Sequence, residues 1–152
     1  RLAAEGDREA IRFPRPMVGD GTLDVSFSGL KTAVVNHVRK HPDVSAADVA
    51  ASFQEAVVDT LLAKGREAAR RVGAKGLALG GGVAANSRLR ERLVEVCAED
   101  GLRSFVPSRA MCTDNAAMVA SAAWYRWQLT GPSPLDTGAV PNLGLSVPAA
   151  TR

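Results

Sequence analysis

The segment GGGVAAN at residues 80–86, which begins with three glycines, is the first feature of this sequence that could carry chemistry. At Gly81 and Gly82 the missing side chain allows positive φ angles and lets a ligand approach the backbone closely. The segment after the turn has a helical pattern. The first turn of a helix offers unpaired N–H groups and the positive end of the helix dipole to an anion. Asn86 falls in that turn, where its amide can hydrogen-bond a sugar or a phosphate.

The glycine spacing predicts a phosphate- or nucleotide-binding turn, but a second interpretation stays equally open. The spacing matches neither the GxGxxG fingerprint of dinucleotide-binding proteins nor the GxxxxGK[ST] fingerprint of P-loop proteins. Glycines are also common where a strand runs directly into a helix and only small residues fit. Residues 80–86 are therefore either a ligand-binding turn or a purely structural one.

The segment MCTDN at 111–115 is the second candidate, because it follows a predicted strand at 102–106. The glycine turn follows another predicted strand, at 76–79. Parallel strands end at one edge of a sheet, so we expect both segments at the same edge. The Asp114 carboxylate could ligate a hard or borderline metal cation there. The local alternative is that Thr113 or Asp114 caps the following helix, a role worth about 1 kcal/mol.

Two residue pairs have spacings that match known sites only in part. His37 and His41 stand four residues apart on a predicted helix, as two metal ligands on one face require. No cysteine or acid is placed to complete a tetrahedral site, so a role at the helix end is favoured. Ser28 and Lys31 form an SxxK pattern, but the SDN and KTG elements of the penicillin-recognising enzymes are absent from the sequence. Ser28 is more simply a helix N-cap.

The composition is that of an ordinary globular domain and excludes several classes of protein. The 152 residues include 46% hydrophobic residues. No uncharged apolar run reaches the roughly 18 residues of a membrane helix, and no segment resembles a signal peptide. Cys97 falls on an inward helix face, and Cys112 has no adjacent base in the sequence. Two cysteines make no disulfide scaffold, so a reduced, cytoplasmic location is expected.

The charges are unevenly distributed along the chain. Residues 64–109 carry 10 basic and 5 acidic groups, a net charge of +5. Residues 1–63 carry 7 basic and 9 acidic groups, and residues 110–152 are neutral. The basic middle could contact nucleic-acid phosphates. The competing interpretation is a solvated helix face formed by Arg88, Arg90, Glu91 and Arg92.

Apolar periodicity and turn residues predict the elements that would position these candidates. Strands alternate with helices in the second half, which implies an α/β fold with a small parallel sheet flanked by helices. Ser45 is the expected N-cap of the longest helix, whose apolar residues are spread widely enough to be covered on two sides. The predicted order is the end of a helix at 1–10, an extended segment at 11–19, a strand at 23–27, helices at 30–40 and 45–72, a strand at 76–79, a helix at 84–99, a strand at 102–106, a helix at 115–128 and a Gly/Pro-rich tail at 129–152.

Four short segments occur in one order: SFSGLKT at 26–32, SFQE at 52–55, GGVAAN at 81–86 followed by Leu89 and Arg90, and CTDNAAM at 112–118. Together they resemble the TsaD family, the tRNA N6-adenosine threonylcarbamoyltransferases, formerly named O-sialoglycoprotein endopeptidases or Gcp glycoproteases. The resemblance covers about residues 10–128. Each motif is weak alone, and the four in order are jointly specific.

The resemblance implies one lobe of an actin/Hsp70-like (ASKHA, RNase H-like) fold, with the C-terminal lobe at residues 11–128. Family members transfer threonylcarbamoyl from threonylcarbamoyl-AMP to N6 of adenosine 37 in tRNAs that read ANN codons. By the same resemblance, Gly81, Gly82 and Asn86 match the nucleotide-binding turn, and Asp114 matches the metal-binding aspartate. The metal of the family is iron or zinc, and a cation that polarises a carbonyl suits attack by a poor amine nucleophile.

The sequence departs from the family pattern at the remaining metal ligands. Those ligands are two histidines of an HxxxH motif in the N-terminal lobe, which this sequence lacks. His37 and His41 have the same spacing but lie in a different segment. The resemblance therefore implies the C-terminal lobe, about half of a longer enzyme. We expect this chain to be inactive alone, with an incomplete site that binds metal weakly or not at all.

Partners and alternatives follow from the same comparison. The family's bacterial protein partners are TsaB and TsaE, and an exposed lobe interface could also support a homodimer. An ASKHA-type ATPase or sugar-kinase lobe would share the fold and the glycine turn, and a non-catalytic scaffold lobe is a further alternative. A metalloprotease, as the older name suggests, would need a cluster such as HExxH, which the sequence does not contain.

Overall fold

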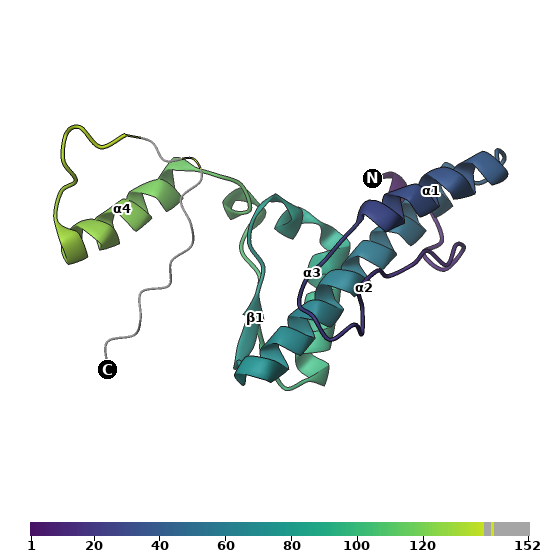
Figure 1. The fold of residues 1–152 in the computed structure, drawn as a ribbon, viewed down its shortest axis with the longest axis horizontal. Coiled ribbons are helices and arrows are strands. Elements are labelled where there is room, and N and C mark those ends of the chain that lie inside the picture. Colours follow the sequence, from purple (N-terminus) through teal and green to yellow (C-terminus); the bar gives the residue numbers. More distant parts are fainter. Residues whose placement is uncertain (139–140, 142–152) are drawn as a thin grey trace. The chain divides into compact units, whose positions relative to one another are not determined.

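The computed structural model of the chain describes residues 1–138 and 141 (Figure 1). It divides into two compact units, Arg1–Thr113 and Asp114–Arg152. The predicted tail at 129–152 falls mostly at 139–140 and 142–152, which lie outside the described residues. None of the helices in the described part combines the length and apolarity that crossing a membrane requires.

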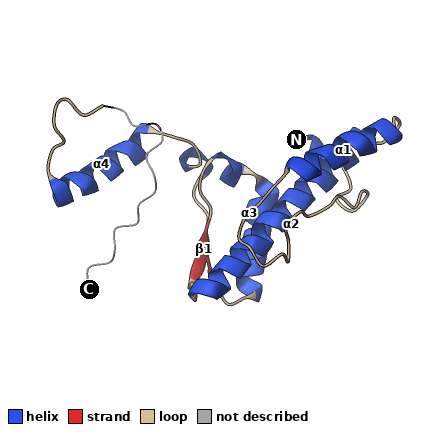
Figure 2. Ribbon diagram, in the orientation of Figure 1, coloured by secondary structure: helices blue, strands red, loops and turns tan. Residues whose placement is uncertain are grey.

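Helices make up most of the secondary structure (Figure 2). The predicted helices after residue 27 and the strands that frame the glycine turn are confirmed, with ends shifted by up to three residues. The elements are a 3-10 turn at Leu2–Ala4, α1 (Ser28–Lys40), α2 (Ala46–Val72), β1 (Gly76–Ala78), a 3-10 turn at Gly82–Ala85, α3 (Ser87–Glu99), β2 (Arg103–Phe105), a 3-10 turn at Arg109–Met111 and, in the second unit, α4 (Ala116–Thr130).

The long helix α2 has clear start and stop signals. Ser45 is its N-cap, as predicted, and the Ser45 side chain accepts a hydrogen bond of 3.3 Å from the Asp48 N–H. Gly73 ends the helix in the left-handed region with φ of +61°, a conformation that favours glycine. The two ends therefore fix the 27 residues between them as one helix.

Both sides of α2 are covered, as its wide apolar face predicted. On one side, Phe13 and Leu30 pack with Ala56 in a cluster that joins α2 to α1 and the N-terminal segment. On the other side, Val58 and Leu62 pack against α3 and the sheet. The buried α3 residues of this second cluster are Leu89, Leu93, Val96 and Cys97, which confirms the inward position predicted for Cys97.

The sheet of the first unit confirms the α/β class. Strand β1 pairs with β2 in parallel, with Leu77 opposite Ser104. Helix α3 is the crossover between the two strands. A Cβ atom at Gly76 would lie 2.5 Å from the Arg103 carbonyl oxygen, so only glycine allows this close pairing. Because the strands are parallel, the segments after each of them start from the same edge.

The predicted helix over residues 1–10 is wrong. Only the 3-10 turn Leu2–Ala4 forms there, because the following backbone groups bond to side chains of α2 instead of continuing a helix. The Asp7 N–H donates to Asp48 Oδ1 at 2.8 Å, and the Ile11 N–H donates to Ser52 Oγ at 3.1 Å. Ser52 Oγ in turn donates to the Asp7 carbonyl at 3.2 Å. These tertiary hydrogen bonds override a helical sequence pattern.

The predicted strand over residues 23–27 is also wrong. These residues have neither helix nor strand structure, and within the described residues no strand lies beside them to complete a ladder. Ser28 is not the N-cap either, because Phe27 holds that position. The Ser28 hydroxyl instead forms a 3.1 Å hydrogen bond with the Ser26 hydroxyl.

Lys64 anchors the loop at residues 17–22 to α2. Its side chain is only 8% exposed, and Nζ donates to Asp20 Oδ1 at 2.7 Å and to the Thr22 carbonyl at 2.8 Å. A buried ammonium is tolerated only when it is paired in this way. The hydrogen bond from Lys64, supported by the Thr22 N–H, lowers the pKa of Asp20 from 3.8 to about 2.

The Asp20 pKa predicts a specific acid sensitivity. A carboxyl group whose pKa is lowered by folding contributes stability that is fully present above its unfolded value of 3.8. That stability is lost as the pH falls toward about 2. We expect Asp20→Asn to lower the free energy of unfolding at neutral pH and to flatten its decline in acid. Urea unfolding followed by circular dichroism at several pH values measures both effects.

Asp24→Asn serves as the matched control, because Asp24 is exposed and makes no hydrogen bond among the residues the structure describes. Acid profiles that run parallel for the wild-type chain and Asp20→Asn would contradict the proposed anchoring role of the Lys64–Asp20 pair.

Candidate functional site

The glycine turn leaves β1 in a conformation that requires glycine at one position. Gly81 has φ of +75° and ψ of 177°, a backbone conformation that other residues rarely adopt. The chain then forms the 3-10 turn Gly82–Ala85, closed by hydrogen bonds of 3.0 Å from Ala84 N–H to Gly81 and from Asn86 N–H to Val83. Apart from the glycine itself and its two chain neighbours, no heavy atom lies within 4 Å of the point where a Cβ would sit at Gly81 or Gly82. The turn therefore presents open backbone to a ligand.

Asn86 ends the turn and caps α3. Its Oδ1 accepts a 3.0 Å hydrogen bond from the Leu89 N–H, and its Nδ2 donates a 2.9 Å hydrogen bond to Gln54 Oε1 on α2. The sequence placed Asn86 within the first helical turn, and the structure places it one residue before the helix. An apolar cavity of about 260 Å³ lies beside it, lined in part by Gln54, Val83 and Leu89.

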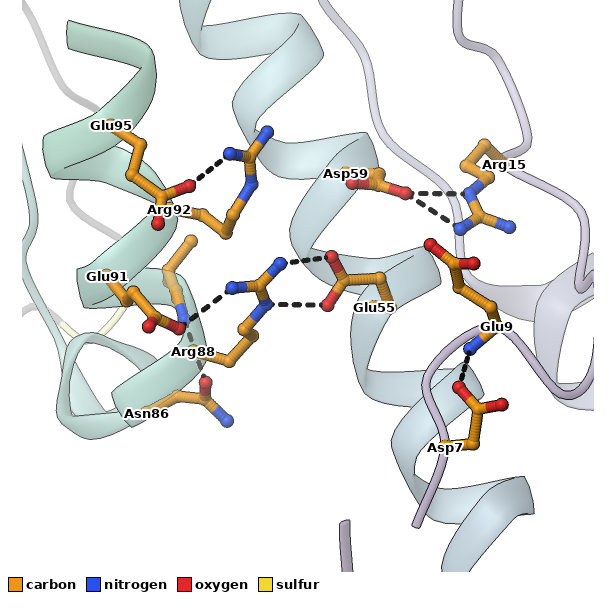
Figure 3. Close-up of polar contacts among 11 residues, drawn as sticks. Asp7, Glu9, Arg15, Glu55, Asp59, Asn86, Arg88, Glu91, Arg92 and Glu95 are labelled. Atoms are coloured by element: carbon orange, nitrogen blue, oxygen red, sulfur yellow. Dashed lines mark hydrogen bonds and ion pairs between the residues drawn. The ribbon is translucent and has the colours of Figure 1, made fainter. Parts of the chain in front are cut away.

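A largely buried ion pair joins α3 to α2 next to this turn (Figure 3). Arg88 donates two hydrogen bonds of 2.7 and 2.8 Å to the two carboxylate oxygens of Glu55, and the two side chains are 14% and 13% exposed. The hydrogen bond from Arg88 lowers the pKa of Glu55 and raises that of Arg88 itself. Arg88 also donates to Glu91 at 2.8 Å. This network fixes the start of α3 against α2.

Arg90 connects the glycine turn to the loop after β2. Its guanidinium donates to the Ala84 carbonyl at 2.9 Å and to the Pro107 carbonyl at 2.6 Å. It also lies 3.7 Å from the sulfur of Cys112. The predicted meeting of these two segments at one sheet edge is therefore confirmed as far as Cys112. The interpretation of residues 88–92 as a solvated face is wrong for Arg88 and Arg90, which bond within the fold.

Asp114 is the first residue of the second unit, and its side chain is exposed. The local alternative for this segment is wrong: the N-cap of α4 is Asn115, whose side chain accepts from the Met118 N–H at 3.0 Å. Neither Thr113 nor Asp114 holds that position. Among the residues that the structure describes, no group of three or more His, Cys, Asp and Glu side chains could hold a metal ion.

The histidine pair and Cys97 have packing roles. His37 meets the Phe13 ring edge-on at 5.7 Å, and the His41 ring lies 4.6 Å from that of His37. His41 is the C-cap residue of α1, the helix-end position that the sequence favoured. Burial raises the pKa of the Cys97 thiol, as expected for a core cysteine.

More than half of the cations in the basic segment at 64–109 form ion pairs within the fold. The paired cations are Lys64 with Asp20, Arg66 with Glu99 and Asp100, Arg70 and Arg71 with Glu67, Arg88 with Glu55 and Arg92 with Glu95. Lys31, Arg39 and Lys40 on α1 form no ion pair within the described residues. The net charge of a segment therefore overstates what it offers to a phosphate.

Gln54 and Glu55 belong to the SFQE motif, but the sequence did not predict them as residues of the site. Both lie on α2, and only the packing of α2 on α3 brings Gln54 to Asn86, 32 residues away in sequence, and Glu55 to Arg88, 33 residues away. No local pattern in the sequence predicts that pairing.

A profile of the TsaD family, described as tRNA N6-adenosine threonylcarbamoyltransferase, matches residues 1–121. The tRNA N6-adenosine threonylcarbamoyltransferase of Geobacter sp. strain M21 is 49% identical over 144 residues, or 93% of this chain and 42% of the relative. The proteins of the same name from Clostridium beijerinckii and Clostridium botulinum (strain 657) are each 46% identical over 149 residues, or 95% of this chain and 44% of each relative. The chain thus spans less than half the length of these curated relatives.

The Glu55–Arg88 pair gives a stability prediction. Glu55→Gln removes the bidentate carboxylate and leaves the largely buried Arg88 guanidinium with only the exposed Glu91 as its ionic partner, which we expect to cost about 2 kcal/mol in the free energy of unfolding. The control is Glu95→Gln, which breaks the more exposed pair with Arg92 and should cost less than about 1 kcal/mol. Urea unfolding of both variants provides the comparison, and equal losses would show that burial of the Glu55 pair has no energetic weight.

Proposed function

This chain belongs to the TsaD family, and from that membership we propose that it is the C-terminal lobe of a tRNA N6-adenosine threonylcarbamoyltransferase. The full enzyme would transfer threonylcarbamoyl from threonylcarbamoyl-AMP to N6 of adenosine 37 in tRNAs that read ANN codons. The observation that carries this proposal is the family match over residues 1–121, which includes both the GGVAAN turn and Asp114. The activity belongs in the cytoplasm, where a chain with two unpaired cysteines stays reduced.

The contribution of this lobe is a nucleotide site at Gly81, Gly82 and Asn86. The open backbone at the glycines and the Ser87 and Arg88 N–H groups, which precede the capped Leu89 N–H at the start of α3, are suited to the phosphate of an adenylate. The apolar cavity beside Asn86 offers a water-poor wall for an uncharged part of the ligand. The cavity supports nucleotide binding over the structural-turn interpretation, because a purely structural turn needs no cavity beside it.

The residues present do not fit an iron or zinc ion by themselves. Asp114 supplies one carboxylate, and within the described residues no cluster of three or more potential ligands includes it. Protein sites for these metals hold the ion with three or four side chains. If Asp114 is a ligand in the full enzyme, the other ligands come from outside this chain. We derive no chemical step through the metal from this chain.

Transfer-RNA and protein partners complete the proposal. The unpaired cations of α1, Lys31, Arg39 and Lys40, are better placed to meet RNA phosphates than the ion-paired cations of 64–109. TsaB and TsaE would assemble with the full enzyme. A homodimer of this chain would use exposed apolar side chains such as Trp124 and Trp127 on α4.

Reconstitution of the modification reaction tests the function. The assay measures threonylcarbamoylation of unmodified tRNA by the chain alone and by the chain combined with the remaining part of a family enzyme and the partner proteins. We expect activity only in the combined mixture, and its loss with Asp114→Ala. The matched control is Asp136→Ala, an exposed aspartate of the same unit outside the motif.

No activity from a demonstrably assembled mixture would overturn the transferase proposal. ATP hydrolysis or sugar phosphorylation that does not depend on tRNA would then favour the kinase-like alternative. The absence of both activities would favour a non-catalytic scaffold.

Metal binding gives a separate prediction. Because one carboxylate binds a divalent ion weakly, we expect the isolated chain to bind Zn²⁺ no more tightly than its Asp114→Ala variant. Isothermal titration with Zn²⁺ measures both affinities. A tight 1:1 site that disappears with Asp114→Ala would contradict the incomplete-site proposal.

A further inference from the structure

We propose that Gln54 is a positioning residue that holds the Asn86 carboxamide in one orientation for a bound nucleotide. This inference rests on the proposed nucleotide site and adds a residue to it. The direct observation is the 2.9 Å hydrogen bond from Asn86 Nδ2 to Gln54 Oε1, formed between two helices across 32 residues of sequence.

The two hydrogen bonds of Asn86 make its orientation unique. Oδ1 accepts from the Leu89 N–H while Nδ2 donates to Gln54, so the two ends of the carboxamide have partners of opposite kind. Rotating the group by 180° would set its NH₂ against the Leu89 N–H and its oxygen against the Gln54 oxygen. Both hydrogen bonds would become repulsive contacts. The helix cap and Gln54 together therefore lock the side chain.

The lock leaves a defined set of groups for a ligand. An amide nitrogen has two protons and an amide oxygen has two lone pairs, so Asn86 keeps one N–H and one lone pair unused. Gln54 Oε1 is engaged, and its Nε2 group makes no hydrogen bond among the described residues. No buried side-chain polar atom in the described chain lacks a partner, so Gln54 Nε2 is accessible to solvent.

The position of Gln54 is itself fixed. Its neighbour Glu55 is held by the bidentate contact with Arg88, and Ala56 is fully buried in the cluster with Phe13 and Leu30. A residue on such a constrained stretch of α2 can impose an orientation on its partner. Binding of a ligand to a preset amide avoids the cost of ordering that side chain.

The first test observes the side chain without ligand. In an NMR spectrum of the wild-type chain, the Asn86 side-chain amide should show one proton protected from solvent exchange. Gln54→Met and Gln54→Ala, which lack the acceptor, should lose that protection, and Gln54→Glu, which keeps an oxygen acceptor, should retain it. Ser52→Ala is the matched control, because it removes two hydrogen bonds of the same helix, to Ile11 and Asp7, that do not involve Asn86.

The second test measures affinity with AMP as the probe, by titration calorimetry. We expect Gln54→Met and Gln54→Ala to weaken AMP binding about five- to tenfold, the effect of one hydrogen bond, and Ser52→Ala to leave it within about twofold. In a chain that already carries Asn86→Ala, the added Gln54→Ala substitution should not weaken AMP binding any more, because the two residues act through one contact.

The outcomes separate the two proposals. If the wild-type chain does not bind AMP, the proposed nucleotide site fails and the positioning role fails with it. If the wild-type chain binds AMP and the Gln54 variants bind it equally well, the nucleotide site stands and the positioning role of Gln54 is overturned. Weakened binding in Ser52→Ala to the same degree would mark a general structural effect and would also overturn it.

Discussion

The two-sided packing of α2 is the constraint on which the first unit depends. One side buries Ala56 against the N-terminal segment and α1, and the other buries Val58 and Leu62 against α3 and the sheet. Burying apolar side chains on both sides stabilises the contacts with each layer and prevents the helix from rotating about its axis. The N-terminal segment, α1, α3 and the sheet therefore all take their positions from their packing on this helix.

The polar residues of α2 gain their roles from that fixed rotation. Each reaches a different part of the chain, with Ser52 bonded to Ile11, Gln54 to Asn86, Glu55 to Arg88, Asp59 to Arg15 and Lys64 to Asp20. Most of these contacts are half-buried, where a hydrogen bond to a charged group is stronger than in water. The helix thus acts as a common support for the N-terminal segment, the loop at 17–22 and the start of α3.

Contacts within the fold also account for much of the positive charge of the basic segment. A net charge of +5 at residues 64–109 reads as a phosphate-binding surface, yet most of its guanidinium groups neutralise carboxylates or bond carbonyls inside the fold. Arg90 is an example, because its guanidinium donates to the Ala84 carbonyl of the glycine turn and to the Pro107 carbonyl of the loop after β2. The guanidinium donors that bond these carbonyls are not available to a phosphate.

The sequence by itself determined those features that depend only on neighbouring residues, such as helix ends and turns. The helix patterns, the Ser45 cap and the glycine turn after a short strand could be predicted, because each depends on neighbours in sequence. The inward position of Cys97 on α3 also followed from the sequence, and the order of motifs was enough to indicate the family that the profile match then identified.

Only the tertiary structure decided the rest. Residues 1–10 have a helical pattern but form no such helix, because their backbone groups bond Asp48 and Ser52 on α2. Residues 23–27 alternate like a strand and yet find no partner strand among the described residues. The contact of Asn86 with Gln54 links positions 32 residues apart. Hydrogen bonds between distant segments depend on how the helices pack, and no local pattern in a single sequence encodes that packing.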